Sequence, residues 1–238
     1  MFAKAFGMVG QVPDKISLEE YRDRQAKFLS KYSESDVIIL CSSPETTHSN
    51  DVHHPYRTQS DLLYMTGWTE PEAVMCAEFV NSAWKIHLFV QPKDTLKEIW
   101  EGRRPGVEGA QQHWPIDQGH SIDELDIILN EIISRSSRVV HRTGVMSNVD
   151  SLVINALERR DRARQRLGMG PTTIADPSSD IAELRLIKSD AEIAQMKFAA
   201  DVSSIAHIAA MRHGGTGSTE NQIQSVIEGF FRYAGTSG

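Results

Sequence analysis

Two different periods of apolar positions run along the chain, and together they predict an α/β protein. Short apolar runs typical of strands begin at four places: "DVIIL" from Asp36, "AVMCAEF" from Ala73, "KIHLFV" from Lys85 and "RVVH" from Arg138. Around them, apolar residues recur three and four positions apart, as on one face of a helix. The resulting order of helix, strand, strand, strand, helix, strand, helix predicts a domain with a mixed sheet.

Helix starts are indicated by capping boxes, in which Ser or Thr is followed three residues later by Glu or Gln. Each side chain of such a pair satisfies a backbone amide of the first helical turn. The pairs are Ser17 with Glu20, Ser121 with Glu124, Ser189 with Glu192, and Thr219 with Gln222. A further helix is expected over 148–166.

Three of these helices carry an apolar stripe that indicates a buried face. The stripes are Leu125, Ile128, Leu129, Ile132 and Ile133; Ile193, Met196, Ala200, His207, Ile208 and Met211; and Ile223, Val226, Ile227, Phe230 and Phe231. Because each apolar side chain contributes roughly 1.5–3 kcal/mol when fully buried, the last stripe needs a covering partner. We expect that partner to be protein that this chain does not contain.

A segment dense in Gly, Pro, Ser and Asp, "GMGPTTIADPSSD", follows the predicted α/β domain. Such composition is typical of a linker. We therefore predict an α/β domain over 1–167, a linker over 168–181, and over 182–238 the start of a second, incomplete domain that is helical.

Composition then narrows the class of protein. The 238 residues are 40% hydrophobic and 24% charged, and the formal net charge is -7. This charge argues against nucleic-acid and anionic-membrane partners, and the basic run 158–166 is interpreted as a solvated helix face. Cys41 and Cys76 lie in strand-like runs, which indicates buried thiols in a reducing compartment. No window approaches the ~20 apolar residues of a membrane span, so we predict a cytoplasmic protein.

Histidines offer the first candidate chemistry. His48, His53 and His54 lie close together in "THSNDVHHPYR", where a solvated loop is favoured over a metal site because the spacing matches no zinc motif. His207 lies on an apolar helix stripe, where a core histidine is favoured over a functional one.

The segment "EIWEGRRPGVEGA", residues 98–110, joins an aromatic, two arginines and three glycines. It matches neither the P-loop nor the dinucleotide-binding pattern. The residues alone indicate a surface loop whose arginines form ion pairs, with lining of a site as the alternative. Since Gly-x-Ser-x-Gly is also absent, the residues alone point to no reaction.

Three stretches in order and in register resemble the aminopeptidase P family, the Xaa-Pro metalloaminopeptidases of the pita-bread superfamily. They are "HPYRTQSDLLYMTGWTEPEAVM" from His54, "KEIWEGRRPGVEGA" from Lys97, and "AELRLIKSDAEIAQMKFAADVSSIAH" from Ala182. Two places depart from the family pattern: Arg57-Thr58-Gln59 stands where the family has Arg-Gln, and Leu62-Leu63-Tyr64 lacks its usual Phe.

The resemblance implies a ribonuclease-H-like N-terminal domain, followed by a pita-bread catalytic domain of which only the first helices are included. In the family two divalent ions, usually Mn²⁺, are bound there by two Asp, one His and two Glu, whose hard oxygens suit this ion. These ligands map to no residue of this chain. We therefore predict no catalytic residue and no metal ligand here, and an inactive fragment when the chain is isolated.

One site residue does follow from the resemblance. Trp100 matches the family's Trp beside the active-site entrance, sometimes that of a neighbouring subunit, where an indole could stack on substrate. The alternative is an indole packed under its own loop. Arg57, Asp61, Tyr64 and Gly67 match the first signature and are interpreted as structural.

The parent protein is thus predicted to remove an N-terminal residue that precedes proline, and to form a homo-oligomer. A prolidase or a creatine amidinohydrolase is the alternative within enzymes. A non-catalytic assembly or regulatory module is the alternative outside them.

Overall fold

The computed structural model describes residues 11–163 and 170–236, with the side chains of 160–163 left aside. Two compact units are present, and each is treated by itself: an α/β unit over Ser17–Leu186, and a second unit that combines the chain before Ser17 with the helical segment from Ile187 on. No helix among the described residues has the length and apolar character that crossing a membrane requires.

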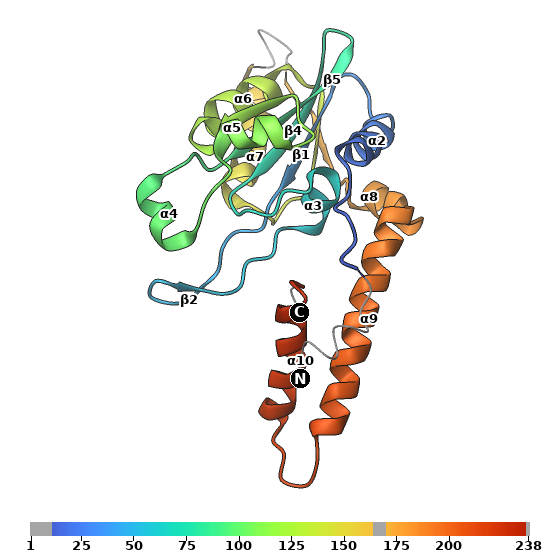
Figure 1. Cartoon of the computed structure of the whole chain (residues 1–238). Helices are drawn as coiled ribbons and strands as arrows, with labels where there is room; N and C mark the ends of the chain where they lie inside the picture. Colours follow the sequence, from blue (N-terminus) through green and yellow to red (C-terminus); the bar gives the residue numbers. More distant parts are fainter. Residues whose placement is uncertain (1–10, 164–169, 237–238) are drawn as a thin grey trace. The chain divides into compact units, whose positions relative to one another are not determined.

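The α/β unit is built on a six-stranded mixed sheet (Figure 1). Its order is β6 (Gln118–Ser121), β5 (Ala83–Val90), β4 (Val74–Val80), β1 (Asp36–Cys41), β7 (Arg138–His141) and β8 (Thr173–Ala175). β4 runs antiparallel to β1 and β5, whereas the other neighbouring pairs are parallel. The predicted mixed sheet is therefore confirmed, with two further short strands at its edges.

Helices and a small hairpin connect these strands. In chain order they are α2 (Leu18–Leu29), the hairpin of β2 (Thr47–Ser49) and β3 (Val52–His53), α3 (Ser60–Thr66), α4 (Thr95–Glu101), α5 (Gly106–His113), a 3-10 turn η1 (Ile122–Glu124), α6 (Leu125–Arg135), α7 (Ser147–Ala163) and α8 (Ser178–Leu186). The Ser17 side chain caps α2, and the capping box of Ser121 and Glu124 opens η1 just before α6.

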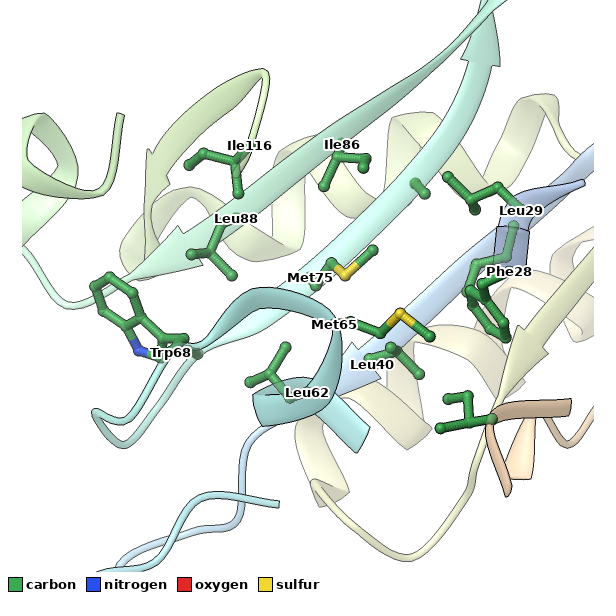
Figure 2. Packing of buried hydrophobic residues seen from close by; sticks show 14 of the residues in the cluster. Phe28, Leu29, Leu40, Leu62, Met65, Trp68, Met75, Ile86, Leu88 and Ile116 are labelled. Atoms are coloured by element: carbon green, nitrogen blue, oxygen red, sulfur yellow. The ribbon is translucent and has the colours of Figure 1, made fainter. Parts of the chain in front are cut away.

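The sheet separates two cores because alternate residues of a strand point to opposite faces. In β1, Ile38 and Leu40 belong to the core beneath α2 and α3, and Val37 and Ile39 to the core beneath α6 and α7. Figure 2 shows the first core, which includes Phe28, Met65 and Leu88. Both cores are closed by helices of the same unit.

The structure extends the α/β unit beyond the boundary that composition suggested at residue 167, a position outside the described residues. Within the expected linker 168–181, β8 pairs with β7, and α8 begins at Ser178. Ile181 is fully buried in the first core. The Gly- and Pro-rich residues therefore flank a short edge strand. Asp180 of α8 also binds the α/β unit, because it accepts a 2.8 Å hydrogen bond from the Tyr32 hydroxyl.

The helical unit is a hairpin of α9 (Asp190–His213) and α10 (Glu220–Tyr233), and the capping boxes predicted at Ser189 and Thr219 begin these helices. Phe230 is buried against Ala206 and Ala209. The last apolar stripe is thus covered in part by α9, whereas the sequence analysis expected its partner outside the chain.

The stripe predicted for α9 is on the wrong face. Ile193, Met196, Ile208 and Met211 are exposed, Met211 by 72%, while Phe198, Val202, Ala206, Ala209 and Ala210 are buried. His207 is exposed as well, so its interpretation as a core histidine is wrong. The reason is that α9 carries apolar residues on two faces, and the smaller side chains let α10 approach.

Candidate functional site

Trp100 lies on α4, a short helix with no buried residue. Its indole is 88% exposed, and Leu96 and Ile99 of the same helix are exposed too. Figure 1 shows α4 standing off from the sheet. An indole packed under its own loop does not match this exposure, so the feature to explain is an apolar surface presented to solvent.

The conformation of α4 is fixed at both ends. Asp94 caps its start by accepting hydrogen bonds from the amides of Leu96 at 3.0 Å and Lys97 at 3.2 Å. These amides, the one from Lys97 first, hold the pKa of Asp94 below its usual value. After the helix, the Arg104 amide donates to Glu98 Oε1 at 2.9 Å, and the Arg104 guanidinium pairs with Glu101. The predicted ion pairing of this loop is therefore present for Arg104.

The first signature segment forms α3 and its flanks. The departure at Arg57-Thr58-Gln59 supplies the helix cap, because Gln59 Oε1 accepts from the amides of Asp61 at 2.6 Å and Leu62 at 3.1 Å. Asp61 is nearly buried and has Arg185 of α8 at 3.6 Å, whereas Arg57 reaches only the Ser60 hydroxyl. The charged partner of Asp61 thus comes from the third signature segment.

Tyr64 joins α2, α3 and α8. The guanidinium of Arg24 lies 4.2 Å from its ring centroid, and that of Arg185 lies at 5.9 Å. The Tyr64 hydroxyl donates to the Leu184 carbonyl at 3.2 Å. Sequence reasoning missed both arginines, because contacts between residues far apart in the chain, 40 residues for Arg24, leave no local pattern.

Gly67 ends α3 in a left-handed conformation, with φ of 70°. A Cβ at this position would lie 2.7 Å from the Tyr21 hydroxyl oxygen. Both the backbone angle and the close approach therefore require glycine. The structural interpretation of Tyr64 and Gly67 agrees with these contacts.

The three loop histidines lie on the exposed β2–β3 hairpin. The rings of His48 and His54 meet with centroids 5.0 Å apart. In the described part of the chain no group of three or more His, Cys, Asp or Glu could hold a metal ion.

A cavity of about 670 Å³ lies where β1, β6 and β7 end and β4 begins. Its lining is Pro44, Glu45, Glu72, Ile122, Gly144, Val145, Met146, Ser147, Asn148 and Asp150. The position follows the rule that ligands of open α/β sheets bind at the carboxyl ends of strands. Trp100 does not line this cavity, and Glu72 is the one lining residue that belongs to the matching stretch that begins at His54.

The acidic groups of this cavity are largely engaged by the protein. Asp150 binds His141 Nε2 at 2.7 Å through one oxygen and the Gly144 amide at 2.8 Å through the other. Glu72 accepts from the Gln91 amide at 2.5 Å. These contacts fix the loop before α7 and leave the cavity without a nucleophile and base in contact.

The two thiols offer no reactive group either. Cys41 and Cys76 are buried, as predicted, and burial raises the pKa of both well above the ordinary thiol value. Thiolate is the reactive form, so these side chains are inert packing residues. Among the described residues, α4 thus presents an exposed apolar surface made of Leu96, Ile99 and Trp100.

The chain matches the family model "Aminopeptidase P, N-terminal domain" over residues 21–141. It is 31% identical over 223 residues to the Xaa-Pro aminopeptidase of Escherichia coli, which covers 93% of this chain and 50% of that protein. It is 30% identical over 220 residues to the mitochondrial intermediate cleaving peptidase 55 of Arabidopsis thaliana, covering 92% of this chain and 42% of the relative.

Among solved structures, the proline aminopeptidase P II of Yersinia pestis matches with a TM-score of 0.85 and 32% identity. The match covers 92% of this chain and 51% of that one. The chain thus spans about half the length of the proteins it resembles, and the similarity extends from α2 into α10.

Proposed function

The chain belongs to the aminopeptidase P family through its N-terminal domain, and from this premise we propose that it forms the first half of an Xaa-Pro aminopeptidase. The reaction is hydrolysis of the peptide bond between an N-terminal residue and a following proline. The observation that carries the proposal is the match with two bacterial enzymes over more than nine tenths of the chain, in sequence and in fold.

The metal centre belongs, in this proposal, to the other half of the enzyme. The described residues contain no group of three or more His, Cys, Asp or Glu that could hold a metal ion, so none of them is proposed as a Mn²⁺ ligand. No step of the reaction is therefore assigned to residues of this chain. Its part is to bind and position.

Trp100 is the residue we propose for that part. Its exposed indole, with Leu96 and Ile99 beside it, offers a flat apolar surface at which a substrate's proline ring could stack. Stacking of this kind requires the indole to reach an active-site entrance, in the same subunit or in a neighbour of a homo-oligomer. The caps at Asp94 and Glu98 would hold it in place.

A fusion protein tests the proposal. This chain, joined to the second half of the Escherichia coli enzyme, should release the first residue from an Xaa-Pro peptide when Mn²⁺ is added. The isolated chain should not. A fusion that folds, as judged by circular dichroism, but has no activity contradicts the proposed function, and Mn²⁺-dependent activity of the isolated chain contradicts the assignment of the metal centre.

The fusion protein also tests Trp100. Trp100→Ala should raise KM several-fold with a smaller change in kcat, because the indole binds substrate without touching the reacting atoms. Ile127→Ala is the control, since it removes an exposed apolar side chain from α6, outside the surface around Trp100. Equal effects of the two substitutions would show that the indole has no specific role.

We further propose a cytoplasmic location and a substrate with proline in the second position. The mitochondrial relative supports a different location, and imaging of the tagged full-length protein distinguishes the two. A prolidase would instead cleave dipeptides only, so a tripeptide and a dipeptide with the same Xaa-Pro start separate these substrate classes.

A further inference from the structure

Two buried histidines have no part in the proposed function. His87 on β5 is 4% exposed, and His120 on β6 is 8% exposed. His87 Nδ1 and His120 Nε2 are 2.9 Å apart, and the rings are stacked with centroids 5.2 Å apart. The ring of Phe89 covers His120 at 4.9 Å.

Two tautomeric arrangements can satisfy the contact between the rings. A hydrogen bond between two imidazole nitrogens contains one proton, so one nitrogen donates and the other accepts. His87 Nε2 lies 3.3 Å from Glu78 Oε1, without a well-formed hydrogen bond. Because a carboxylate only accepts, the arrangement that turns a donor toward Glu78 has the His87 proton on Nε2 and lets Nδ1 accept from His120 Nε2–H.

Charged groups of β4, β5, α6 and η1 surround this pair. Glu78 of β4 binds Arg135 of α6 at 3.0 Å, and Arg135 also binds Glu131 at 2.7 Å. Lys85 of β5 disfavours a charge on both rings, while Glu78 favours one on His87 and Glu124 of η1 favours one on His120.

Burial is the largest of these influences. It lowers the pKa of His87 to about 4, and it lowers the pKa of His120 in the same direction. Both rings are therefore neutral in the closed sheet at pH 7.

β6 is the strand that depends most on this contact. It has four residues, lies at the edge of the sheet and pairs with β5 alone. If both rings are protonated, all four ring nitrogens are donors, and the hydrogen bond across 2.9 Å cannot form.

We propose that His87 and His120 form a proton-operated latch, which holds edge strand β6 on β5 at neutral pH and releases it under acid while the centre of the sheet stays folded.

The size of the effect follows from proton linkage. An opened strand exposes His87 to water, where its pKa returns toward 6.5. A group with a lowered folded pKa contributes its full stability above 6.5, and that stability is lost as the pH falls toward 4. At pH 5 the difference favours opening by about 30-fold relative to pH 7.5, from His87 alone.

Hydrogen exchange of the full chain tests the proposal. Protection factors, corrected for intrinsic exchange, are measured at pH 7.5 and at pH 5. We expect the amides of Gln118–Ser121 to lose protection by at least about 30-fold, and those of β1 and β7 to change by less than threefold. A uniform change across the sheet, or no change in β6, contradicts the latch.

A variant separates the latch from general acid sensitivity. In His87→Gln the amide can accept from His120 and donate toward Glu78, so it mimics the neutral ring without titrating. We expect the pH effect on β6 to fall below about fivefold, with wild-type behaviour in the control His113→Gln, which alters an exposed histidine of α5. An unreduced effect in His87→Gln overturns the proposal.

If the variant fails to fold, NMR of the imidazole nitrogens in the wild-type chain provides a second test, because it reports which nitrogens of His87 and His120 are protonated. Both rings should be Nε2-protonated at pH 7.5. The opposite tautomer of His87, or protonation of both rings without loss of β6 protection, also overturns the proposal.

Discussion

The α/β unit buries its apolar side chains much more completely than the helical hairpin does. The first closes a core on each face of its sheet with its own helices, so Phe28, Met65 and Leu88 are fully buried. The second buries Ala206, Ala209 and Phe230 between α9 and α10 and leaves Met196 and Met211 in water. The difference teaches that one unit contains its own partners, whereas the other has a second apolar face for which the described residues provide none.

The largest effect is expected in the self-contained unit. Phe28→Ala removes a ring from the centre of the first core, and a buried Phe→Ala change costs about 3–5 kcal/mol. Urea unfolding followed by the fluorescence of buried Trp68 should show a midpoint lowered accordingly. A change below about 1 kcal/mol would mean that this core is not closed by α2.

The same substitution in the hairpin should act locally. Phe230→Ala should cost about 2–4 kcal/mol of local stability, because some of its neighbours, such as Val226 and Ile227, are only partly buried and can relax. Hydrogen exchange should then show lost protection in α9 and α10, with an unchanged urea midpoint for the α/β unit. A lowered midpoint would show that the two units unfold together.

A smaller loss of stability is expected from replacing glycines with positive φ, and each unit offers one such glycine for comparison. Gly67→Ala places a Cβ 2.7 Å from the Tyr21 hydroxyl at φ of 70°, whereas Gly217 of the hairpin turn has φ of 94° and nothing within 4 Å. We expect a loss of about 2–3 kcal/mol at Gly67 and about 1 kcal/mol at Gly217, because only the first adds a clash to the strain. Calorimetry on both variants measures the order, and equal losses contradict it.

The smallest effect on stability should come from the outward face of α9. Met196→Gln with Met211→Gln should change stability by less than about 0.5 kcal/mol, since both side chains are already in water. Self-association, measured by sedimentation, should fall because an exposed apolar face is reduced. Phe230 and Phe231 are the wrong residues for this test, since their substitution also loosens the helix pair.

The sequence predicted the central strands and the long helices, because their apolar runs and capping boxes are local signals. It missed β6 and β8, whose "QGHS" and "TIA" are too short and, for β6, too polar to show a strand pattern. It also chose the wrong face of α9, since period alone cannot rank two apolar faces. The segment "TLKEIWE" forms helix α4, although the sequence analysis interpreted its second half as part of a loop.

The candidate site was predicted less completely than the fold. Trp100 was found through resemblance, and its exposure now gives that expectation a physical basis, although its contact with substrate stays a prediction. The histidine pair of β5 and β6 was not found at all. His87 and His120 are 33 residues apart, and parallel pairing of two strands is a relation that no local pattern reveals.

The hydrogen bond between Tyr32 and Asp180 has a practical consequence for protein engineering. Burial, together with this bond, raises the pKa of the Tyr32 hydroxyl, and the bond lowers the pKa of the Asp180 carboxyl. Each pKa therefore depends on a residue far away in the sequence. An α/β unit moved into another protein should therefore include the chain through Leu186. A unit cut at the apparent linker would leave the half-buried Tyr32 hydroxyl without its acceptor, Asp180.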